Sequence, residues 1–466
     1  MMLPRLIIAD ETQEGKVPAS LLLIQALRNR QIPVNVFFCG RSEQDLRLMN
    51  LMSDAPVFCL DAYTMSSPRN LKTLFQRRAS EEALNIVSVP LGSAVDEKTF
   101  QVRPEGPELA KILDCGVVPV ITASHAAVMT TNLVLMAMSA FDEILPGRVM
   151  GLILASLKSS RDFQLQEKEL NRRSPLLTLG FMPAVSDCSM PSMRAMSADN
   201  PSLTIIPVKS AALQLGGQVR QVDWQVLDAL ARLCGAWSAP EPHSYPARNM
   251  DVAVVGPAES LEGEGNLEVF RLMGCAVYGY DHRKDPFPIS AGAIYFPHTL
   301  NEPYIEELLK DVNFRKGVLA SVQSNKLILA TGASALLFGE AYRTSDQRKL
   351  EGLRIFPYSG NSTQGAHNRK HAQRRVEMRG ITDSCFTGNN EKLRGCTVGG
   401  FTIANPGNLA APCLAYREMR EDVEMGLTGW VHSYCFVTDL RLDLWSAMEP
   451  LNRWLNRKRK APSVPR

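Results

Sequence analysis

Short apolar runs that alternate with helical patterns limit the fold of this chain more than any other feature. The runs at 4–10, 34–40, 85–91 and 117–123 are rich in Val, Ile and Leu and show little polar alternation. Strands of this composition are typically buried on both faces, as in a parallel sheet covered by helices. The sequence therefore predicts an α/β protein with parallel sheets, in which further strands are expected at 151–157 and 202–208.

A proline-rich stretch indicates the boundary between two domains. Residues 238–249, SAPEPHSYPARN, contain three prolines and little apolar content, which is typical of a linker. Strand-like and helix-like segments resume at residue 250. We therefore expect one α/β domain over 1–237, a second over 250–448, and a basic tail over 449–466, for a chain of 466 residues.

Composition excludes several classes of protein. The net charge of +3 gives no general attraction to nucleic acid or to a membrane surface. The ten cysteines form no CxxC pair and no Cys/His cluster at metal-binding spacing, so no metal site is predicted and a reducing cytoplasm is favoured. No apolar run reaches the length of about 18 residues that a membrane-spanning helix needs.

Five basic residues stand close together in the second half of the chain: Arg369, Lys370, Arg374, Arg375 and Arg379. Such a cluster can bind phosphate or carboxylate groups of a ligand or partner. Runs of charge are more often simply solvated surface, and both interpretations stay open here.

The stretch LILATGASALLFGE, residues 327–340, has the pattern of a nucleophile elbow. In such an elbow, a strand ends in a strained turn that presents one reactive side chain and continues into a helix. The turn at 331–334 contains no cysteine, and Ser334 lies too far along it to be the presented residue.

These motifs and their order resemble the cobyrinic acid a,c-diamide synthases over nearly the whole chain. The matching stretches are NLEVFRLMGCAVYGYDHRKD, LATGASALLFGE, which aligns with the family's YAECGGLMYLGE, and TGWVHSYCF. The family joins an ATP-using, dethiobiotin-synthetase-like domain to a class I glutamine amidotransferase domain, and it amidates carboxylates of a tetrapyrrole. The resemblance implies these two domains here, a P-loop-like parallel sheet domain and an amidotransferase-like domain.

The departures from the family pattern fall on its chemistry. The alignment places Gly332 where the family has its cysteine nucleophile, and His432 on the catalytic histidine. Release of ammonia from glutamine needs a thiolate that a histidine activates, so His432 would be a base with nothing to deprotonate. His298 stands in the region that forms the family's oxyanion-hole turn, where glycines are usual.

The nucleotide site shows similar losses in the run DETQEGKVPAS. Gly15 and Lys16 keep the GK pair of a P-loop, but Asp10 takes the place of its first glycine and Val17 replaces the hydroxyl that holds Mg²⁺. Ser88 stands near the position of a family glutamate. Acidic side chains would repel a polyphosphate, so ATP and Mg²⁺ are not expected to bind in the usual way.

These losses predict a catalytically inactive homologue that acts as a tetrapyrrole-binding protein or as a regulatory or scaffold protein. Its expected partners are a tetrapyrrole or an active tetrapyrrole-modifying enzyme, and a homo-oligomer is compatible with the sequence. Two alternatives stay open. One is ATP-dependent amidation of a tetrapyrrole carboxylate with free ammonia, and the other is a purely structural subunit of a larger assembly.

Overall fold

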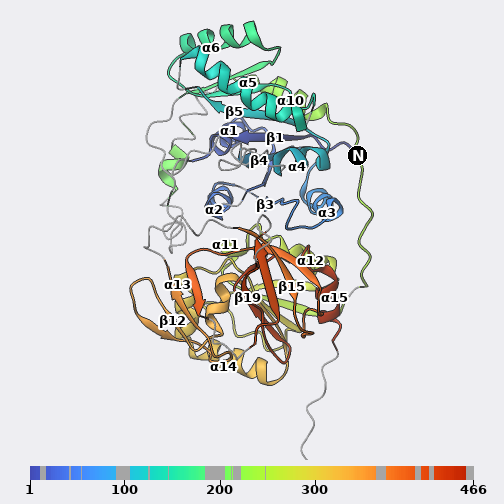
Figure 1. Ribbon diagram of the computed structural model, residues 1–466, viewed down its shortest axis with the longest axis vertical. Coiled ribbons are helices and arrows are strands. Elements are labelled where there is room, and N and C mark those ends of the chain that lie inside the picture. Colours follow the sequence, from blue (N-terminus) through green and yellow to red (C-terminus); the bar gives the residue numbers. More distant parts are fainter. Residues whose placement is uncertain are drawn as a thin grey trace, which may run out of the picture. The chain divides into compact units, whose positions relative to one another are not determined.

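The computed structural model divides the chain into two compact units (Figure 1). One consists of Met1–Ala62 and Pro68–Glu241, and the other of Tyr63–Ser67 and Pro242–Arg466. The predicted linker 238–249 spans the division at Glu241. The structure describes the chain except for residues 11–16, 41–42, 54, 91–104, 124–125, 145, 184–190, 192–204, 211–212, 214–221, 247, 364–373, 405–410, 419–423 and 458–466.

The first unit is built on a seven-stranded sheet with the order β3-β2-β4-β1-β5-β6-β7. All of its strand pairs are parallel. The strands are β1 (Arg5–Asp10), β2 (Val34–Phe38), β3 (Phe58–Cys59), β4 (Leu84–Pro90), β5 (Gly116–Thr122), β6 (Leu152–Leu157) and β7 (Thr178–Pro183). The predicted parallel sheet is therefore confirmed.

Helices flank this sheet (Figure 1). They are α1 (Ala19–Asn29), α2 (Glu43–Met52), α3 (Pro68–Arg78), α4 (Glu105–Leu113), α5 (Ala127–Ile144), α6 (Ser160–Arg173) and α10 (Trp224–Arg232). Leucine-rich faces of α1, α2 and α10 share one buried core with the central strands. The strand predicted at 202–208 is wrong over 205–208, because residues 206–210 are helical and β7 forms the edge of the sheet, and residues 202–204 lie outside the described residues.

The second unit contains a six-stranded sheet with the order β20-β21-β11-β10-β8-β9. All neighbours run parallel except β20, which is antiparallel to β21. Its strands are β8 (Asp251–Val255), β9 (Ala276–Tyr280), β10 (Ala293–Phe296), β11 (Leu327–Thr331), β20 (Trp430–His432) and β21 (Cys435–Thr438). The connecting helices are α11 (Ala258–Leu261), α12 (Asn266–Leu272), α13 (Glu302–Lys310), α14 (Val312–Gln323) and the 3₁₀ helix η3 (Gly332–Leu337).

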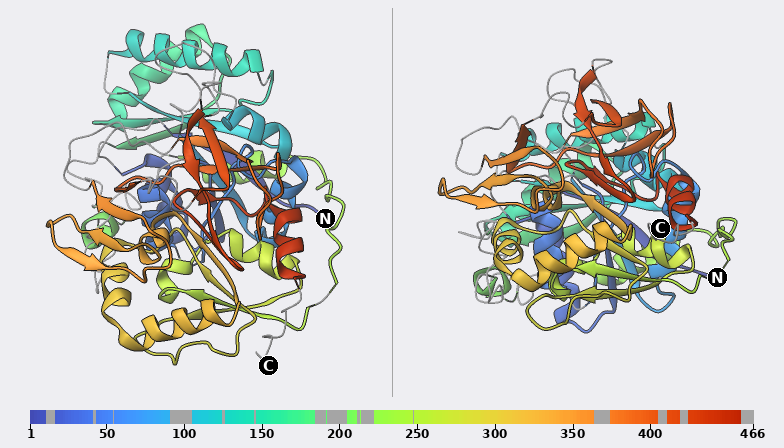
Figure 2. Two further views of the ribbon diagram at one scale, coloured as in Figure 1. Left: turned by 60° about the horizontal axis from the view of Figure 1, so that its bottom comes forward. Right: turned by 90° about the horizontal axis from the view of Figure 1, so that it is seen from below.

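Two smaller sheets complete the second unit (Figure 2). One has the order β13-β12-β14-β17 and consists of β12 (Ala341–Arg343), β13 (Lys349–Glu351), β14 (Ser359–Ser362) and β17 (Phe401–Ala404). The other is antiparallel with the order β19-β18-β15-β16-β22. Its strands are β15 (Arg375–Gly380), β16 (Lys392–Cys396), β18 (Leu414–Glu418), β19 (Glu424–Thr428) and β22 (Arg441–Leu442).

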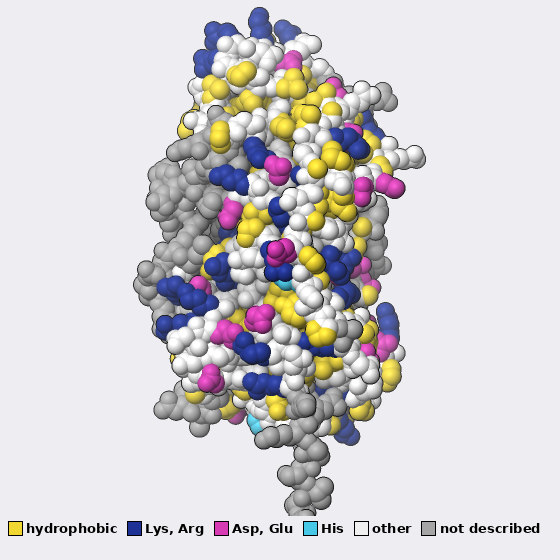
Figure 3. Space-filling model, turned by 90° about the vertical axis from the view of Figure 1, so that its right-hand side faces the viewer, with side chains coloured by type: hydrophobic (Ala, Val, Ile, Leu, Met, Phe, Trp, Pro, Cys, Tyr) yellow, Lys and Arg dark blue, Asp and Glu magenta, His cyan; other side chains and the backbone are white. Residues whose placement is uncertain are grey.

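The predicted basic tail 449–466 is wrong over its first part, because helix α15 (Met448–Leu455) continues the fold there. Leu451, Trp454 and Leu455 recur at helical spacing and are buried, so this segment belongs to the hydrophobic core. On the face shown in Figure 3, basic and acidic side chains are interspersed. Among the described residues, no helix is both long enough and apolar enough to cross a bilayer.

Candidate functional site

The elbow motif lies at the carboxyl end of β11, which is buried along its whole length. Gly332 follows this strand with φ of +62°, a left-handed conformation that favours glycine, and η3 begins at the same residue. The Gly332 N–H donates a hydrogen bond to the Leu440 carbonyl oxygen at 3.0 Å, which fixes the turn against the segment after β21. The strand, strained turn and helix of an elbow are therefore all present.

The space beside Gly332 is already filled. A Cβ atom added at Gly332 would lie 2.6 Å from the Cβ of His298 and 3.1 Å from its Cα. It would also lie 3.3 Å from a methyl group of Val398. Because the closest atoms belong to the root of a side chain and to the backbone, no simple rotation relieves the contact. The elbow thus lacks a nucleophile and also lacks the room for one.

His298 belongs to a buried polar cluster at this edge of the sheet. Its Nδ1 lies 3.2 Å from Oε2 of Glu264, and both side chains are almost fully buried. Burial alone would raise the pKa of the Glu264 carboxyl, but the His298 imidazole, Arg441 and the Asn266 N–H hold that pKa below its ordinary value. A buried carboxylate is tolerated where opposite charge and hydrogen bonds compensate for lost hydration, as they do here.

Asn266 connects this cluster to its surroundings. Its N–H donates to Glu264 at 3.1 Å, and its side-chain amide donates to the Tyr295 hydroxyl and the Leu442 carbonyl, both at 2.9 Å. Its side-chain oxygen accepts from the Leu444 N–H at 2.8 Å. Burial raises the pKa of the Tyr295 phenol far above its ordinary value, and the Glu264 carboxylate adds to this effect. Tyr295 therefore stays neutral in this network.

The structure does not bring His432 to the elbow. His432 lies opposite Cys435 at the tip of the β20–β21 hairpin, and Cys435 pairs with Ile328 near the start of β11. Gly332 follows the other end of β11. The predicted pairing of these two positions as base and nucleophile site is therefore wrong for this chain. The histidine that lies beside Gly332 is His298, which precedes it in the sequence.

Ser334 cannot replace the missing nucleophile. Its side chain is fully buried, and its hydroxyl donates a hydrogen bond to the carbonyl oxygen of Pro297. The bond ties η3 to the turn that follows β10. Ser334 is therefore a structural residue of the elbow, as its late position in the motif predicts.

The first unit shows a comparable change at the amino end of α1. Asp10 ends β1, is buried, and accepts a hydrogen bond from the Ser20 N–H through Oδ2 at 2.8 Å. The N-cap residue Pro18 offers no side-chain cap. The amino end of a helix attracts anions through its free N–H groups and its dipole, and in P-loop proteins it holds phosphate. In this chain, the Asp10 carboxylate accepts a hydrogen bond from the amino end of α1.

The described part of the P-loop-like run lacks an oxygen ligand that Mg·ATP would need. Val17 is buried and offers no oxygen to a metal ion. The Ser88 hydroxyl, near the position of the family glutamate, is engaged with the Ser20 hydroxyl at 2.9 Å. Across the part of the chain that the structure describes, no group of three or more His, Cys, Asp or Glu residues is placed to hold a metal ion. Gly15 and Lys16 lie outside the described residues.

The predicted basic cluster is only partly available. Arg369 and Lys370 lie outside the described residues. Arg374 forms an ion pair with Glu418 at 2.9 Å, and Arg375 is buried with its guanidinium over the Tyr63 ring. Arg379 is exposed on β15.

Arg379 lies directly opposite Lys392 of β16, so two cations stand on one face of the antiparallel sheet. Like charges in such cross-strand positions repel each other. Glu377 is the acid that the structure places near them, at 3.2 Å from the Lys392 ammonium. It also pairs with Arg417 at 2.9 Å, so one carboxylate serves two cations.

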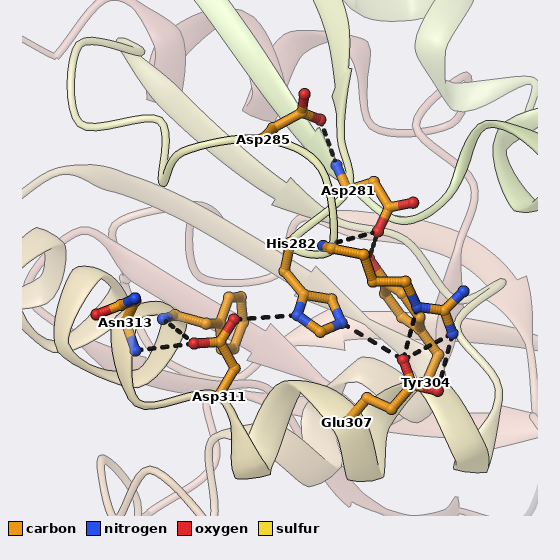
Figure 4. Close-up of polar contacts among 9 residues, drawn as sticks. Asp281, His282, Asp285, Tyr304, Glu307, Asp311 and Asn313 are labelled. Atoms are coloured by element: carbon orange, nitrogen blue, oxygen red, sulfur yellow. Dashed lines mark hydrogen bonds and ion pairs between the residues drawn. The ribbon is translucent and has the colours of Figure 1, made fainter.

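A second polar cluster, which the sequence analysis did not single out, lies at the carboxyl end of β9 (Figure 4). His282 lies between Asp311 and Glu307, with its Nδ1 3.0 Å from the first carboxylate and its Nε2 3.5 Å from the second. Arg283 binds both oxygens of Glu307. Asp311 also caps α14 by accepting hydrogen bonds from two backbone N–H groups. The cluster ties the turn after β9 to two helices.

Taken alone, the geometry defines a class of protein: a two-unit α/β protein in which a buried strand, a glycine turn and a 3₁₀ helix form an elbow without a side chain at its turn. No family model matches the chain. It is 22% identical to cobyrinate a,c-diamide synthase of Limosilactobacillus reuteri over 344 residues, 73% of this chain and 74% of that protein. It is 24% identical to hydrogenobyrinate a,c-diamide synthase of Pseudomonas aeruginosa, over 76% of this chain and 78% of that protein. The chain is therefore similar to these a,c-diamide synthases over about three quarters of its length, at an identity of 22–24%.

Solved structures show weaker similarity. PurLQS from Thermotoga maritima is 13% identical, with a TM-score of 0.31, and the match covers 44% of this chain and 98% of that one. The MinC:MinD cell division protein complex of Aquifex aeolicus is 10% identical, with a TM-score of 0.29, over 46% of this chain and 95% of that one.

Proposed function

We propose that this protein is a catalytically inactive homologue of the cobyrinate a,c-diamide synthases that binds a tetrapyrrole or serves as a regulatory or scaffold partner of an active enzyme. The observation that carries the proposal is the elbow. Gly332 offers no side chain, and His298 fills the place that one would need. Without a thiolate, no covalent intermediate with glutamine can form.

The first unit supports the same conclusion by an independent route. Formation of an acyl phosphate requires ATP and Mg²⁺, whose charge and oxygen ligands position and activate the transferred phosphoryl group. Asp10 holds the Ser20 N–H with a carboxylate, and Val17 has no metal-binding oxygen. This observation weighs against amidation with free ammonia, because that reaction would still need the nucleotide.

A binding role for a tetrapyrrole is supported by the cations on the five-stranded sheet. The tetrapyrroles that a,c-diamide synthases amidate carry carboxylates at their rim. Guanidinium and ammonium groups bind carboxylates through charge-assisted hydrogen bonds. Arg379 and Lys392 stand opposite each other on this sheet. We expect them to contact such carboxylates, in place of the buried Arg375 and the paired Arg374.

Assays of the wild-type protein test the loss of activity. We expect no release of glutamate from glutamine and no Mg·ATP hydrolysis above a buffer control, with the L. reuteri relative as the positive control. Measurable Mg·ATP hydrolysis would instead favour amidation with free ammonia. A copurified amidating enzyme in a native pull-down would support the regulatory or scaffold role.

A titration with uroporphyrin, a tetrapyrrole rich in carboxylates, tests the binding role. Substitution of Arg379 and Lys392 by Ala should weaken binding by at least about tenfold, because a hydrogen bond to a charged group contributes about 1.5–3 kcal/mol. Lys349→Ala, which removes an exposed cation from β13, is the matched control. Equal affinity for the wild type and the double variant would exclude this surface as the carboxylate site.

A further inference from the structure

Two segments close on each other at the elbow. One is the turn after β10, which contains Pro297 and His298, and the other is the start of η3 at Gly332. The parallel pairing of β10 with β11 aligns Phe296 with Ala330, so both turns leave the sheet side by side. Their approach is so close that a Cβ at Gly332 would lie 2.6 Å from the Cβ of His298.

The turn after β10 is held on both sides. The Ser334 hydroxyl, on η3, donates to the Pro297 carbonyl. On the other side, the His298 imidazole lies 3.2 Å from Glu264, whose second carboxylate oxygen accepts the Asn266 N–H. All of these side chains are buried. The turn that carries His298 is therefore anchored by the Ser334 hydrogen bond on one side and by the buried contact with Glu264 on the other.

We infer that His298 is a lock on the elbow: its Cβ and backbone exclude any side chain from position 332. The inference rests on the proposed loss of the nucleophile and adds a physical reason why that loss cannot be reversed at one position. Restoring cysteine at Gly332 would force the thiol into space that His298 occupies. Two positions must change together before the elbow can present a side chain.

Backbone strain alone makes a different prediction. A residue other than glycine is strained at φ of +62° whatever surrounds it. That strain would make Gly332→Ala destabilising by the same factor whatever residue occupies position 298. The lock instead requires the effect to depend on the Cβ of residue 298, because that atom makes the closest contact.

Alanine and glycine at position 298 separate these two explanations. Both substitutions remove the imidazole and its contact with Glu264, but only His298→Gly removes the Cβ. Urea unfolding would measure how much Gly332→Ala reduces the folding equilibrium constant in each background. We expect similar reductions in the wild-type and His298→Ala backgrounds. In the His298→Gly background we expect the reduction to be at least about tenfold smaller. Equal reductions in all three backgrounds would overturn the lock.

A second measurement needs no substitution at His298. The chain has seven histidines, so their imidazole signals can be followed by NMR in a protein labelled at histidine. In Gly332→Ala the signal of His298, assigned from the His298→Ala spectrum, should shift while those of the other histidines stay in place. An unchanged His298 signal in folded Gly332→Ala would also overturn the lock. Neither measurement depends on activity, so glutamine or Mg·ATP hydrolysis by the wild type would contradict the proposed function alone.

Discussion

Asp10 is the residue whose substitution most directly tests the altered amino end of α1. Its buried carboxylate accepts the Ser20 N–H where Pro18 cannot cap the helix. Asp10→Ala removes both the acceptor and the charge, and should lower the free energy of unfolding by about 1–3 kcal/mol. Asp10→Asn keeps an acceptor and should cost less, because only the favourable charge–dipole interaction is lost. Urea denaturation would measure both variants, and equal stability of Asp10→Ala and the wild type would contradict the capping role.

Individual residues of the site were predictable to different degrees. Gly332 was placed at a turn because tiny residues follow an apolar run, and the structure has that turn. The repulsion expected from Asp10 was derived from charge, but its contact with Ser20 depends on how β1 leads into α1. The role of His298 could not be read from sequence, because its contact with Gly332 arises from the register of two parallel strands. The assignment of His432 rests on the alignment alone, which does not reveal that a turn at Ser433 and Tyr434 places it opposite Cys435.

At the scale of elements, the turn after β9 is held against α13 and α14 by a carboxylate that is sensitive to acid. Burial opposes ionisation of Asp311, but the Phe314 N–H, His282 and the Asn313 N–H lower the pKa of Asp311 below its ordinary value. A lowered pKa in the folded state stabilises the protein above the unfolded pKa of about 3.9. This stability is lost as the pH falls from there through the folded pKa.

Asp311→Asn should therefore change the response to acid. We expect the wild type to lose more unfolding free energy than this variant between about pH 5 and pH 3, because only the wild type takes up a proton at this position on unfolding. At neutral pH, Asp311→Ala should cost about 0.5–2 kcal/mol through the lost N-cap. Asp228→Asn, an exposed position on α10, is the control. Parallel pH profiles of the wild type and Asp311→Asn would exclude the contribution of this carboxylate.

Most elements could be predicted because each has a strong local pattern. The strands of the parallel sheets are continuous apolar runs, and α13 starts at Asn301, whose side chain caps it. The errors fall where tertiary packing decides the structure. The apolar run at 202–208 suited a strand equally well but is helical over 206–210. Residues 449–455 were assigned to a tail because of the basic residues beyond them, although Trp454 is fully buried.

At the scale of the whole molecule, the proposed inactivity rests on a different half of one reaction in each unit. The first unit has its own core and a buried carboxylate at the amino end of α1, and the second has its own core and a glycine at the turn of the elbow. Either loss is sufficient to stop glutamine-dependent amidation, because that reaction needs both activated carboxylate and ammonia. The two packed cores are compatible with the proposed role in binding.

This reasoning predicts opposite responses to two ligands of the active relatives. A ligand that binds only the folded state at a hundred times its Kd adds about 2.7 kcal/mol of stability, which raises the Tm by several degrees for domains of this size. Mg·ATP should leave the Tm of this protein unchanged while it raises that of the L. reuteri enzyme. Uroporphyrin should raise the Tm of this protein, and less so in the Arg379→Ala, Lys392→Ala double variant. If Mg·ATP raised the Tm of this protein as much as that of the relative, the proposed inactivity of the first unit would be contradicted. If uroporphyrin did not raise the Tm, a tetrapyrrole-binding role would be contradicted and the role of a partner-binding subunit would remain.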